Sequence, residues 1–278
     1  METLRTTVLC EGLQFGEGPR WHDSRLWVSD IQAGRVYTVD EDGRLEVAVE
    51  ARGASGLGWL PDGRLVISTL GRPYVRCVGD GEVTTLYDLR AFGWSLNDMV
   101  VGPDGRIYAD LYLEPAVPPP GAIVLVTPGG EVRVVAEDMR TPNGLAITPD
   151  GSTLIVSETD SGLVLAFRID ADGGLHDRRV FADLGAGRRP DGLCLDEAGA
   201  VWVGSYNTGE FLRVLDGGEI THRIETPGRS AIAPALGGPD RRTLYLVVND
   251  DKNPAMELAV RRGHIETTRV DVPGAGWP

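Results

Sequence analysis

Short apolar runs alternate with tight-turn residues along the whole chain, and one arrangement recurs. A run rich in branched and aromatic side chains follows each copy of a turn that most often reads Pro-Asp-Gly. The clearest copy spans residues 141–151. There Asn143 precedes a short apolar run, and the turn Pro149-Asp150-Gly151 follows that run. Such runs, bounded by Asp-Gly turns, are typical of antiparallel strands. No helical periodicity is sustained, so the pattern predicts an all-β protein.

Alignment on this turn gives six copies of one unit. The third positions of the turns are residues 24, 63, 105, 151, 199 and 241, which lie 39, 42, 46, 48 and 42 residues apart. Each unit contains about four short strands, and this repeat length is typical of a β-propeller blade. Stacking the units in a closed ring buries both faces of every blade. We therefore predict a single six-bladed β-propeller domain over residues 1–278, with four-stranded antiparallel blades around a central channel.

Two details of this ring are specific to the chain. The N-terminal run 4–9 could complete the last blade and close the ring, but the C-terminal run 264–270 competes for the same outer position. The sequence leaves that choice open. Residues 111–120 interrupt the third blade between its second and third strands, and their prolines stiffen the segment. We interpret this loop as a wall or lid beside the channel.

Composition and charge limit the partners. The chain has 41 acidic and 27 basic residues and a net charge of −14, so nucleic acid is not expected to bind. No apolar run reaches the ~18–20 residues of a membrane span, and no signal-peptide pattern opens the chain. Three cysteines without metal-site spacing indicate reduced thiols in a cytoplasmic protein. We expect a small-molecule substrate, no membrane partner, and a monomer or weak homo-oligomer.

Candidate chemistry lies where the first strand of each unit begins. In a propeller these strands line the channel, so the residues that open them should meet at one mouth. Four of the six are carboxylates or amides, namely Glu17, Asn97, Asn143 and Asp191. Their oxygen atoms suit Ca²⁺, Mg²⁺ or Mn²⁺, and the absence of His and Cys makes Zn²⁺ the less favoured alternative. The other interpretation is that these residues only accept hydrogen bonds that hold the strand starts.

Several neighbours of this set have two interpretations. Asp98 follows Asn97 directly, and strand alternation sends it to the opposite side, which favours a structural role. Glu114 in the proline-rich loop is either solvated or functional. Trp94 precedes Ser95 at the mouth, where it could line a substrate pocket. No histidine lies at a channel-lining start, so a Ser-His-Asp arrangement is not expected, and no glycine-rich loop indicates a nucleotide cofactor.

Several stretches in order resemble the gluconolactonase, regucalcin (senescence marker protein 30) and luciferin-regenerating enzyme family. The resemblance runs from about residue 11 to about residue 272. The matching stretches are Glu17-Gly18-Pro19-Arg20-Trp21, Asn97-Asp98, Pro142-Asn143-Gly144-Leu145, Pro190-Asp191-Gly192-Leu193-Cys194-Leu195-Asp196, Gly199-Ala200-Val201-Trp202-Val203 and Ala235-Leu236-Gly237-Gly238-Pro239-Asp240.

The resemblance implies roles for individual residues. It implies a six-bladed propeller with one divalent metal ion, most often Ca²⁺, held by Glu17, Asn143 and Asp191. Asp191 also matches the acid/base that activates the attacking water. Asn97 matches a residue that contacts substrate or completes the metal shell. These correspondences predict a lactone hydrolase.

The substrate side of the correspondence is less complete. We expect Asn97, Ser95, Trp94 and Glu114 to bind substrate, with Glu114 within one position of a lid glutamate of some relatives. Sugar-lactone hydrolases often carry an arginine where this chain has Ser95, which favours a lactone other than a sugar lactone.

The prediction is therefore a divalent-metal-dependent hydrolase of a lactone or related cyclic ester. In this reaction the metal polarises the carbonyl and Asp191 activates water. Three alternatives stay open: a phosphotriesterase-type hydrolase on the same metal site, a non-catalytic calcium-binding or regulatory propeller, and a different metal-assisted reaction.

Overall fold

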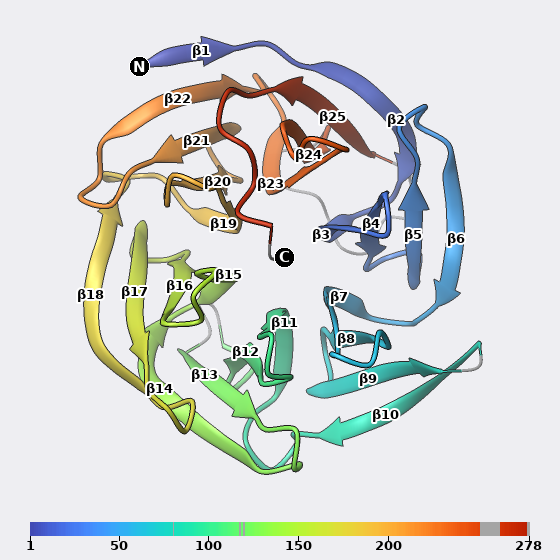
Figure 1. Ribbon diagram of the computed structural model, residues 1–278, viewed down its shortest axis with the longest axis vertical. Helices are drawn as coiled ribbons and strands as arrows, with labels where there is room; N and C mark the ends of the chain where they lie inside the picture. Colours follow the sequence, from blue (N-terminus) through green and yellow to red (C-terminus); the bar gives the residue numbers. More distant parts are fainter. Residues whose placement is uncertain (80, 117, 119, 251–261, 277–278) are drawn as a thin grey trace.

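The computed structural model describes residues 1–79, 81–116, 118, 120–250 and 262–276. Over these residues the chain forms strands β1 to β25 and no helix. The strands make six sheets that stand in a ring around a central channel (Figure 1). The predicted six-bladed β-propeller is confirmed. No helix capable of spanning a membrane occurs in this described part of the chain.

The blades follow the chain order. The first blade contains β3 (Gly16–His22), β4 (Arg25–Asp30), β5 (Arg35–Val39) and β6 (Leu45–Glu50), and the second contains β7 (Ala54–Trp59), β8 (Leu65–Thr69), β9 (Tyr74–Gly79) and β10 (Glu82–Asp88). The third contains β11 (Ser95–Val101), β12 (Ile107–Tyr112), β13 (Pro120–Val126) and β14 (Val132–Arg140). The fourth contains β15 (Pro142–Ile147), β16 (Thr153–Glu158), β17 (Leu163–Ile169) and β18 (Leu175–Asp183). The last two contain β19 (Pro190–Leu195), β20 (Val201–Ser205), β21 (Glu210–Val214) and β22 (Ile220–Glu225); and β23 (Ser230–Gly237), β24 (Thr243–Asn249), β25 (Gly263–Arg269) and β2 (Thr7–Leu13).

The turn that defined the repeat shares one backbone feature in all six copies. Its third residue has a positive φ in every blade, a conformation that glycine adopts without steric cost. The values are 59° for Ser24, 86° for Gly63, 80° for Gly105, 72° for Gly151, 79° for Gly199 and 57° for Arg241. The first copy differs in one respect: Asp23 also has a positive φ (48°) and His22 pairs with Arg25, so a two-residue loop joins β3 and β4.

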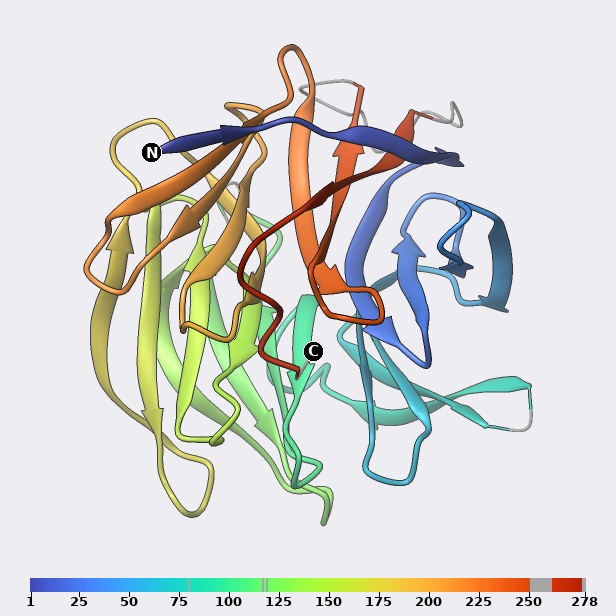
Figure 2. The ribbon, with the colours of Figure 1, turned by 45° about the horizontal axis from the view of Figure 1, so that its top comes forward.

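Both chain ends contribute to closing the ring. The C-terminal run forms β25, the third strand of the sixth blade, and the N-terminal run forms β2, which pairs antiparallel with β25 as the outer strand. One strand was not predicted. β1 (Glu2–Leu4) pairs parallel with β22 and gives the fifth blade a fifth strand. Figure 2 shows β1 and β2 passing along the outer rim of the two blades that they join. β1 thus covers an edge that would otherwise be unpaired.

The core lies between the blades. The buried apolar side chains form six clusters, and each cluster is shared by two neighbouring blades. Between the fourth and fifth blades, for example, Ile155 packs in one cluster with Leu193 and Val203. No blade could bury these faces alone, which is why the ring is the unit that folds.

The predicted interruption lies between β12 and β13, but it is shorter than expected: residues 113–119 separate the strands, whereas Leu111 and Tyr112 belong to β12 and Pro120 to β13. Residues 117 and 119 of this loop lie outside the described residues, so its interpretation as a lid stays a prediction.

Candidate metal and substrate site

Each first strand contains an irregularity close to its start. The pairing register with the second strand shifts between Glu17 and Arg20 in the first blade and between Leu96 and Met99 in the third. Equivalent shifts occur in the other four blades. A β-bulge bends its strand and changes the direction of nearby side chains. The four predicted channel residues lie at or beside these bulges, between 6% and 8% exposed.

A glycine follows three of the four channel residues, and at Gly144 two blades approach closely. A Cβ atom on Gly144 would lie 2.6 Å from the backbone oxygen of Asp191 and 2.6 Å from the backbone nitrogen of Leu193. Both distances are too short for any side chain. This close approach brings Asn143 of the fourth blade beside Asp191 of the fifth.

Buried serines hold the backbone of these positions across the blade boundaries. The Ser29 hydroxyl donates to the backbone oxygen of Ser55 (2.6 Å), and that of Ser68 donates to the backbone oxygen of Asn97 (2.5 Å). The Ser157 hydroxyl donates to the backbone oxygen of Asp191 (2.5 Å). Each serine comes from the second strand of the preceding blade. The sequence repeats this serine at the end of the β-type run, but we did not predict its role.

Three of the predicted site residues, Asn97, Asn143 and Asp191, contact one another. The Asn97 Nδ2 donates to Asn143 Oδ1 at 3.2 Å, and the Ser55 hydroxyl donates to Asn97 Oδ1 at 2.7 Å. A hydrogen bond also links the side chains of Asn143 and Asp191. The structure thus brings residues of the second to fifth blades together at one mouth of the channel.

The carboxylates at this mouth carry unfavourable electrostatics. Burial, followed by the nearby charges of Asp191 and Asp98, holds the pKa of Glu17 well above its usual range. Burial and the charge of Asp98 raise the pKa of Asp191 to about 7, against the opposing hydrogen bonds from Asn143 and the Gly192 backbone. Both buried acids therefore resist ionisation. A bound cation would favour their ionised forms and remove the repulsion between them.

The residues present fit a divalent cation. Asp191 Oδ1 is buried and has no hydrogen-bond partner among the described residues. Amide and carboxylate oxygens, with no thiolate or imidazole, are the donors that Ca²⁺ and Mg²⁺ prefer. The described residues contain no group of three or more His, Cys, Asp and Glu side chains suited to a metal ion. A site here would therefore need the amide oxygen of Asn143, and that of Asn97 could complete it.

An ion pair lies deeper in the channel. The Arg20 guanidinium donates from Nη2 to Asp98 Oδ1 at 2.9 Å, and both side chains are buried. The other Asp98 oxygen accepts the backbone N–H of Leu145 at 3.3 Å. Asp98 thus joins the first, third and fourth blades, in agreement with the structural role favoured by the sequence.

Two further residues at the mouth were missed by the sequence reasoning. The Asp110 carboxylate accepts the backbone N–H groups of Asn97 (2.6 Å) and Asp98 (3.1 Å) and so holds the bulge of β11. Its pKa is raised mainly by burial. The pKa of Tyr112 is also raised, mainly by burial and further by the charges of Asp110, Asp191 and Glu17. Both residues lie where β12 ends, one and three positions beyond the run that the sequence identified.

A hollow of about 830 Å³ opens over the second and third blades at this mouth; we call it the mouth hollow. It is lined by Trp94 and Tyr112, and by Pro115 and Ala116 of the proline-rich loop. Trp94 is exposed, as its predicted position in a pocket wall requires.

Ser95 and Glu114, the other predicted substrate residues, do not line this hollow. The Ser95 hydroxyl is fully buried and accepts the backbone N–H of Gly71 at 2.8 Å. It is therefore not placed to meet a molecule in the mouth hollow. Glu114 is exposed beside Pro115.

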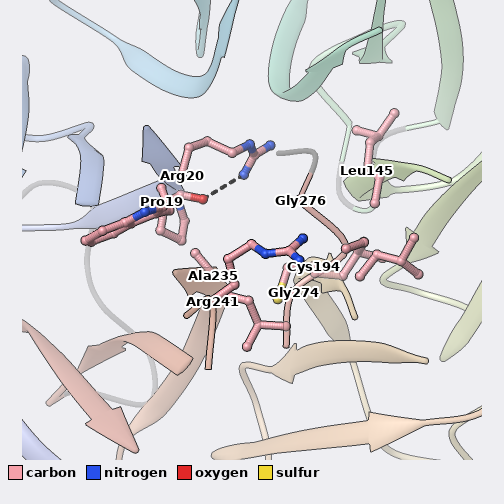
Figure 3. Close-up of a pocket in the computed structure, with 14 residues that line it drawn as sticks. Pro19, Arg20, Leu145, Cys194, Ala235, Arg241, Gly274 and Gly276 are labelled. Atoms are coloured by element: carbon pink, nitrogen blue, oxygen red, sulfur yellow. Dashed lines mark hydrogen bonds between the residues drawn. The ribbon is translucent and has the colours of Figure 1, made fainter. Parts of the chain in front are cut away.

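The opposite end of the channel contains a smaller hollow of about 110 Å³ (Figure 3). Arg20, Cys194 and Arg241 line it, and residues 274–276 lie across it, fixed by the hydrogen bond from the Ala275 N–H to the Leu195 backbone oxygen (3.0 Å). The predicted site residues do not line this hollow.

Comparisons with known proteins agree with this architecture. The sequence profile of the SMP-30/Gluconolactonase/LRE-like region matches residues 15–249. A 6-deoxy-6-sulfogluconolactonase from Pseudomonas putida is 30% identical, with 100% of this chain and 98% of that protein covered. A pentonolactonase from Haloferax volcanii is 28% identical, with 98% and 96% covered.

Solved structures show the same ring. A calcium-binding protein named regucalcin from Agrobacterium tumefaciens superposes with a TM-score of 0.82 at 24% identity, covering 100% of this chain and 98% of that chain. A gluconolactonase from Xanthomonas campestris superposes with a TM-score of 0.76 at 28% identity, covering 97% and 89%.

Proposed function

The chain belongs to the SMP-30/gluconolactonase/LRE-like family, and from that premise we propose that it is a divalent-metal-dependent hydrolase of lactones or related cyclic esters. The observation that carries the proposal is the pair of buried carboxylates, Glu17 and Asp191, beside two amides at one channel mouth. Two full-length relatives are named as lactonases, of a sulfogluconolactone and of a pentonolactone. These names favour a sugar-derived lactone over the non-sugar lactone that Ser95 suggested.

The proposed ligands are Glu17, Asn143 and Asp191, and the proposed ion is Ca²⁺, because all the donors are oxygen atoms. When bound, the ion would polarise the lactone carbonyl and stabilise negative charge on its oxygen. Asn97 completes the shell or donates its amide to the substrate. Asp110 supports this position by holding the Asn97 backbone.

Asp191 is the proposed general base. It accepts a proton from water as the water oxygen bonds to the carbonyl carbon. The ring C–O bond then breaks, and the leaving alkoxide takes up that proton to give the hydroxy acid. In the metal-free site, burial and the charge of Asp98 raise the pKa of Asp191 to about 7. A bound cation would lower this pKa and keep the carboxylate ionised, as a general base requires.

The test is hydrolysis of gluconolactone, dihydrocoumarin, a γ-lactone and a phosphotriester by chelator-treated protein, before and after Ca²⁺, Mg²⁺, Mn²⁺ or Zn²⁺ is restored. We expect lactone turnover that returns with metal. Asp191→Asn should lower kcat by about 100-fold or more. Asp62→Asn, in an exposed turn, is the matched control and should leave kcat unchanged.

Full activity and metal content in Asp191→Asn would contradict the assignment of the base. Turnover of the phosphotriester alone would identify the site as a phosphotriesterase. Tight metal binding with no turnover of any ester would favour a binding or regulatory protein.

A further inference from the structure

The mouth hollow is lined by three arginines. Arg52 precedes β7, Arg72 lies between β8 and β9, and Arg76 lies on β9. Arg76 Nη1 donates to the backbone oxygen of Arg52 at 3.4 Å, so these two residues are neighbours. Arg52 and Arg72 are exposed, and Arg76 is partly buried. The second blade therefore contributes three arginines to the lining of one hollow.

These arginines lack the partners that most others have. Elsewhere arginines pair with carboxylates, as Arg35 does with Glu50 (2.8 Å) and Arg90 with Asp88 (2.6 Å). For Arg52, Arg72 and Arg76, no carboxylate of the described residues lies within ion-pair distance. A cationic cluster without internal partners is unexpected in a chain with a net charge of −14. It creates a local positive potential that attracts anions.

The hollow lies beside the candidate reaction centre, because Trp94 and Tyr112 of its lining flank the start of β11. Tyr112 lines the hollow, and the same side chain experiences the charges of Asp191 and Glu17. The hydrogen bond from Gly71 to Ser95 joins the arginine-bearing loop to β11, which carries Asn97. Trp94 adds an exposed aromatic face to the same wall. The arginines therefore line a hollow next to the strand that carries Asn97.

We propose that the substrate is a lactone with an anionic substituent at the end away from its carbonyl, and that Arg52, Arg72 and Arg76 bind this substituent. The proposal rests on the lactonase function proposed above and specifies its substrate class. A carboxylate, a sulfonate and a phosphate share the chemistry that guanidinium groups recognise, since each offers two or three oxygens to paired N–H donors. An anion at this point also replaces the missing internal partners.

The test compares lactones that differ only in this substituent. D-Glucaro-1,4-lactone has a carboxylate where D-glucono-1,4-lactone has a hydroxymethyl group, and the 6-phospho and 6-sulfo derivatives of gluconolactone extend the comparison. We expect kcat/KM to be about tenfold or more higher for at least one anionic lactone than for its neutral partner. Added salt should reduce this ratio, and the preferred derivative identifies the anion.

Variants locate the preference. Arg72→Gln, Arg76→Gln and Arg52→Gln should each lower the anionic-to-neutral ratio by raising KM for the anionic lactone, while kcat/KM for the neutral one stays the same. Arg140→Gln is the matched control, because Arg140 is exposed at the end of β14, has no ion pair within the described part of the chain, and does not line the hollow. Its ratio should equal that of the wild type.

A wild-type ratio of one or less for every pair would overturn the proposal even if neutral lactones are hydrolysed, and so would an unchanged ratio in all three variants. If no lactone is hydrolysed, the lactonase function fails. In that case the same pairs are titrated calorimetrically into wild-type protein. Tighter binding of the anionic member, lost in the arginine variants, supports the anion site, and equal binding overturns it.

Discussion

At the scale of single residues, the mouth of the channel combines burial with charge of one sign. Glu17 and Asp191 are buried, and burial with neighbouring carboxylates raises both pKa values. Unfolding would return both acids to water and to their ordinary pKa values. The site is therefore a source of instability in the metal-free protein, and a cation turns it into a source of stability.

The stability of the metal-free protein should fall as pH rises between about 4 and 7. In this range Asp191 still binds its proton in the folded state, with a pKa of about 7, whereas the unfolded chain, with the ordinary value of 3.8, has lost it. The folded state binds more protons, so the free energy of unfolding decreases with pH and levels off above about 7. Thermal unfolding of chelator-treated protein measures this decrease.

Asp191→Asn separates this effect from other titrating groups. The variant should unfold at a higher temperature than the wild type at pH 8 without metal, and it should lose the stabilisation by Ca²⁺. In the wild type, Ca²⁺ should raise the unfolding temperature more at pH 8 than at pH 5, because protons compete for the same oxygens. An equal rise at both pH values would argue against Asp191 as a ligand.

Residues that repeat could be predicted from the sequence, and residues that act across the channel could not. Asn97 and Asn143 were found because they occupy the same position in two units. Asp110 and Tyr112 follow a strand run whose end the sequence does not mark, and the pairing of Arg20 with Asp98 joins positions 78 apart. Such pairings depend on the dimensions of the closed ring.

At the scale of elements, the geometry of the site depends on how closely neighbouring first strands pack. Gly144 lies at the contact between β15 and β19, with backbone atoms of Asp191 and Leu193 at 2.6 Å from its Cβ position. Backbone atoms cannot rotate away as a flexible side chain can. Any side chain at this position must separate the two blades.

Gly144→Ala should therefore destabilise the protein by about 1–3 kcal/mol and weaken metal binding, since it displaces Asp191 relative to Asn143. Chemical denaturation and calcium titration measure the two effects. Gly79→Ala is the control, because a Cβ there has no atom within 4 Å and the residue has no positive φ. It should change neither quantity, and a similar loss in both variants would contradict the packing argument.

At the scale of the whole molecule, ring closure was predicted, but the strand that each terminal run forms was not. The N-terminal and C-terminal runs were both candidates for the outer strand of the last blade. In the structure they form two different strands of that blade, β2 and β25. Hydrophobic pattern alone could not separate them, because both are short β-type runs. The extra strand β1 has only three residues, Glu2–Leu4, which is too short to produce a pattern.

The N-terminal strands should contribute unequally to stability. β2 supplies Leu13, which is fully buried in a cluster with Val28 and Val247 and thereby links the first and sixth blades. β1 only adds to an outer edge, and Leu4 is partly buried there. A chain that begins at Gln14 loses the outer strand of the closing blade, whereas one that begins at Thr6 loses β1 alone.

We expect the shorter chain to unfold about 10 °C or more below the full-length protein. Loss of a buried leucine alone costs about 2–5 kcal/mol, and each kcal/mol lowers the midpoint by about 2–4 °C in a protein of this size. The chain that begins at Thr6 should unfold within a few degrees of the wild type. Calorimetry of both chains, with an initiating methionine added, measures the difference. Equal losses in the two chains would mean that β1 rather than β2 closes the ring. A larger loss in the chain that begins at Gln14 would show that β2 closes it. The contact between the first and sixth blades would then be the one that joins the six sheets into a single cooperative ring.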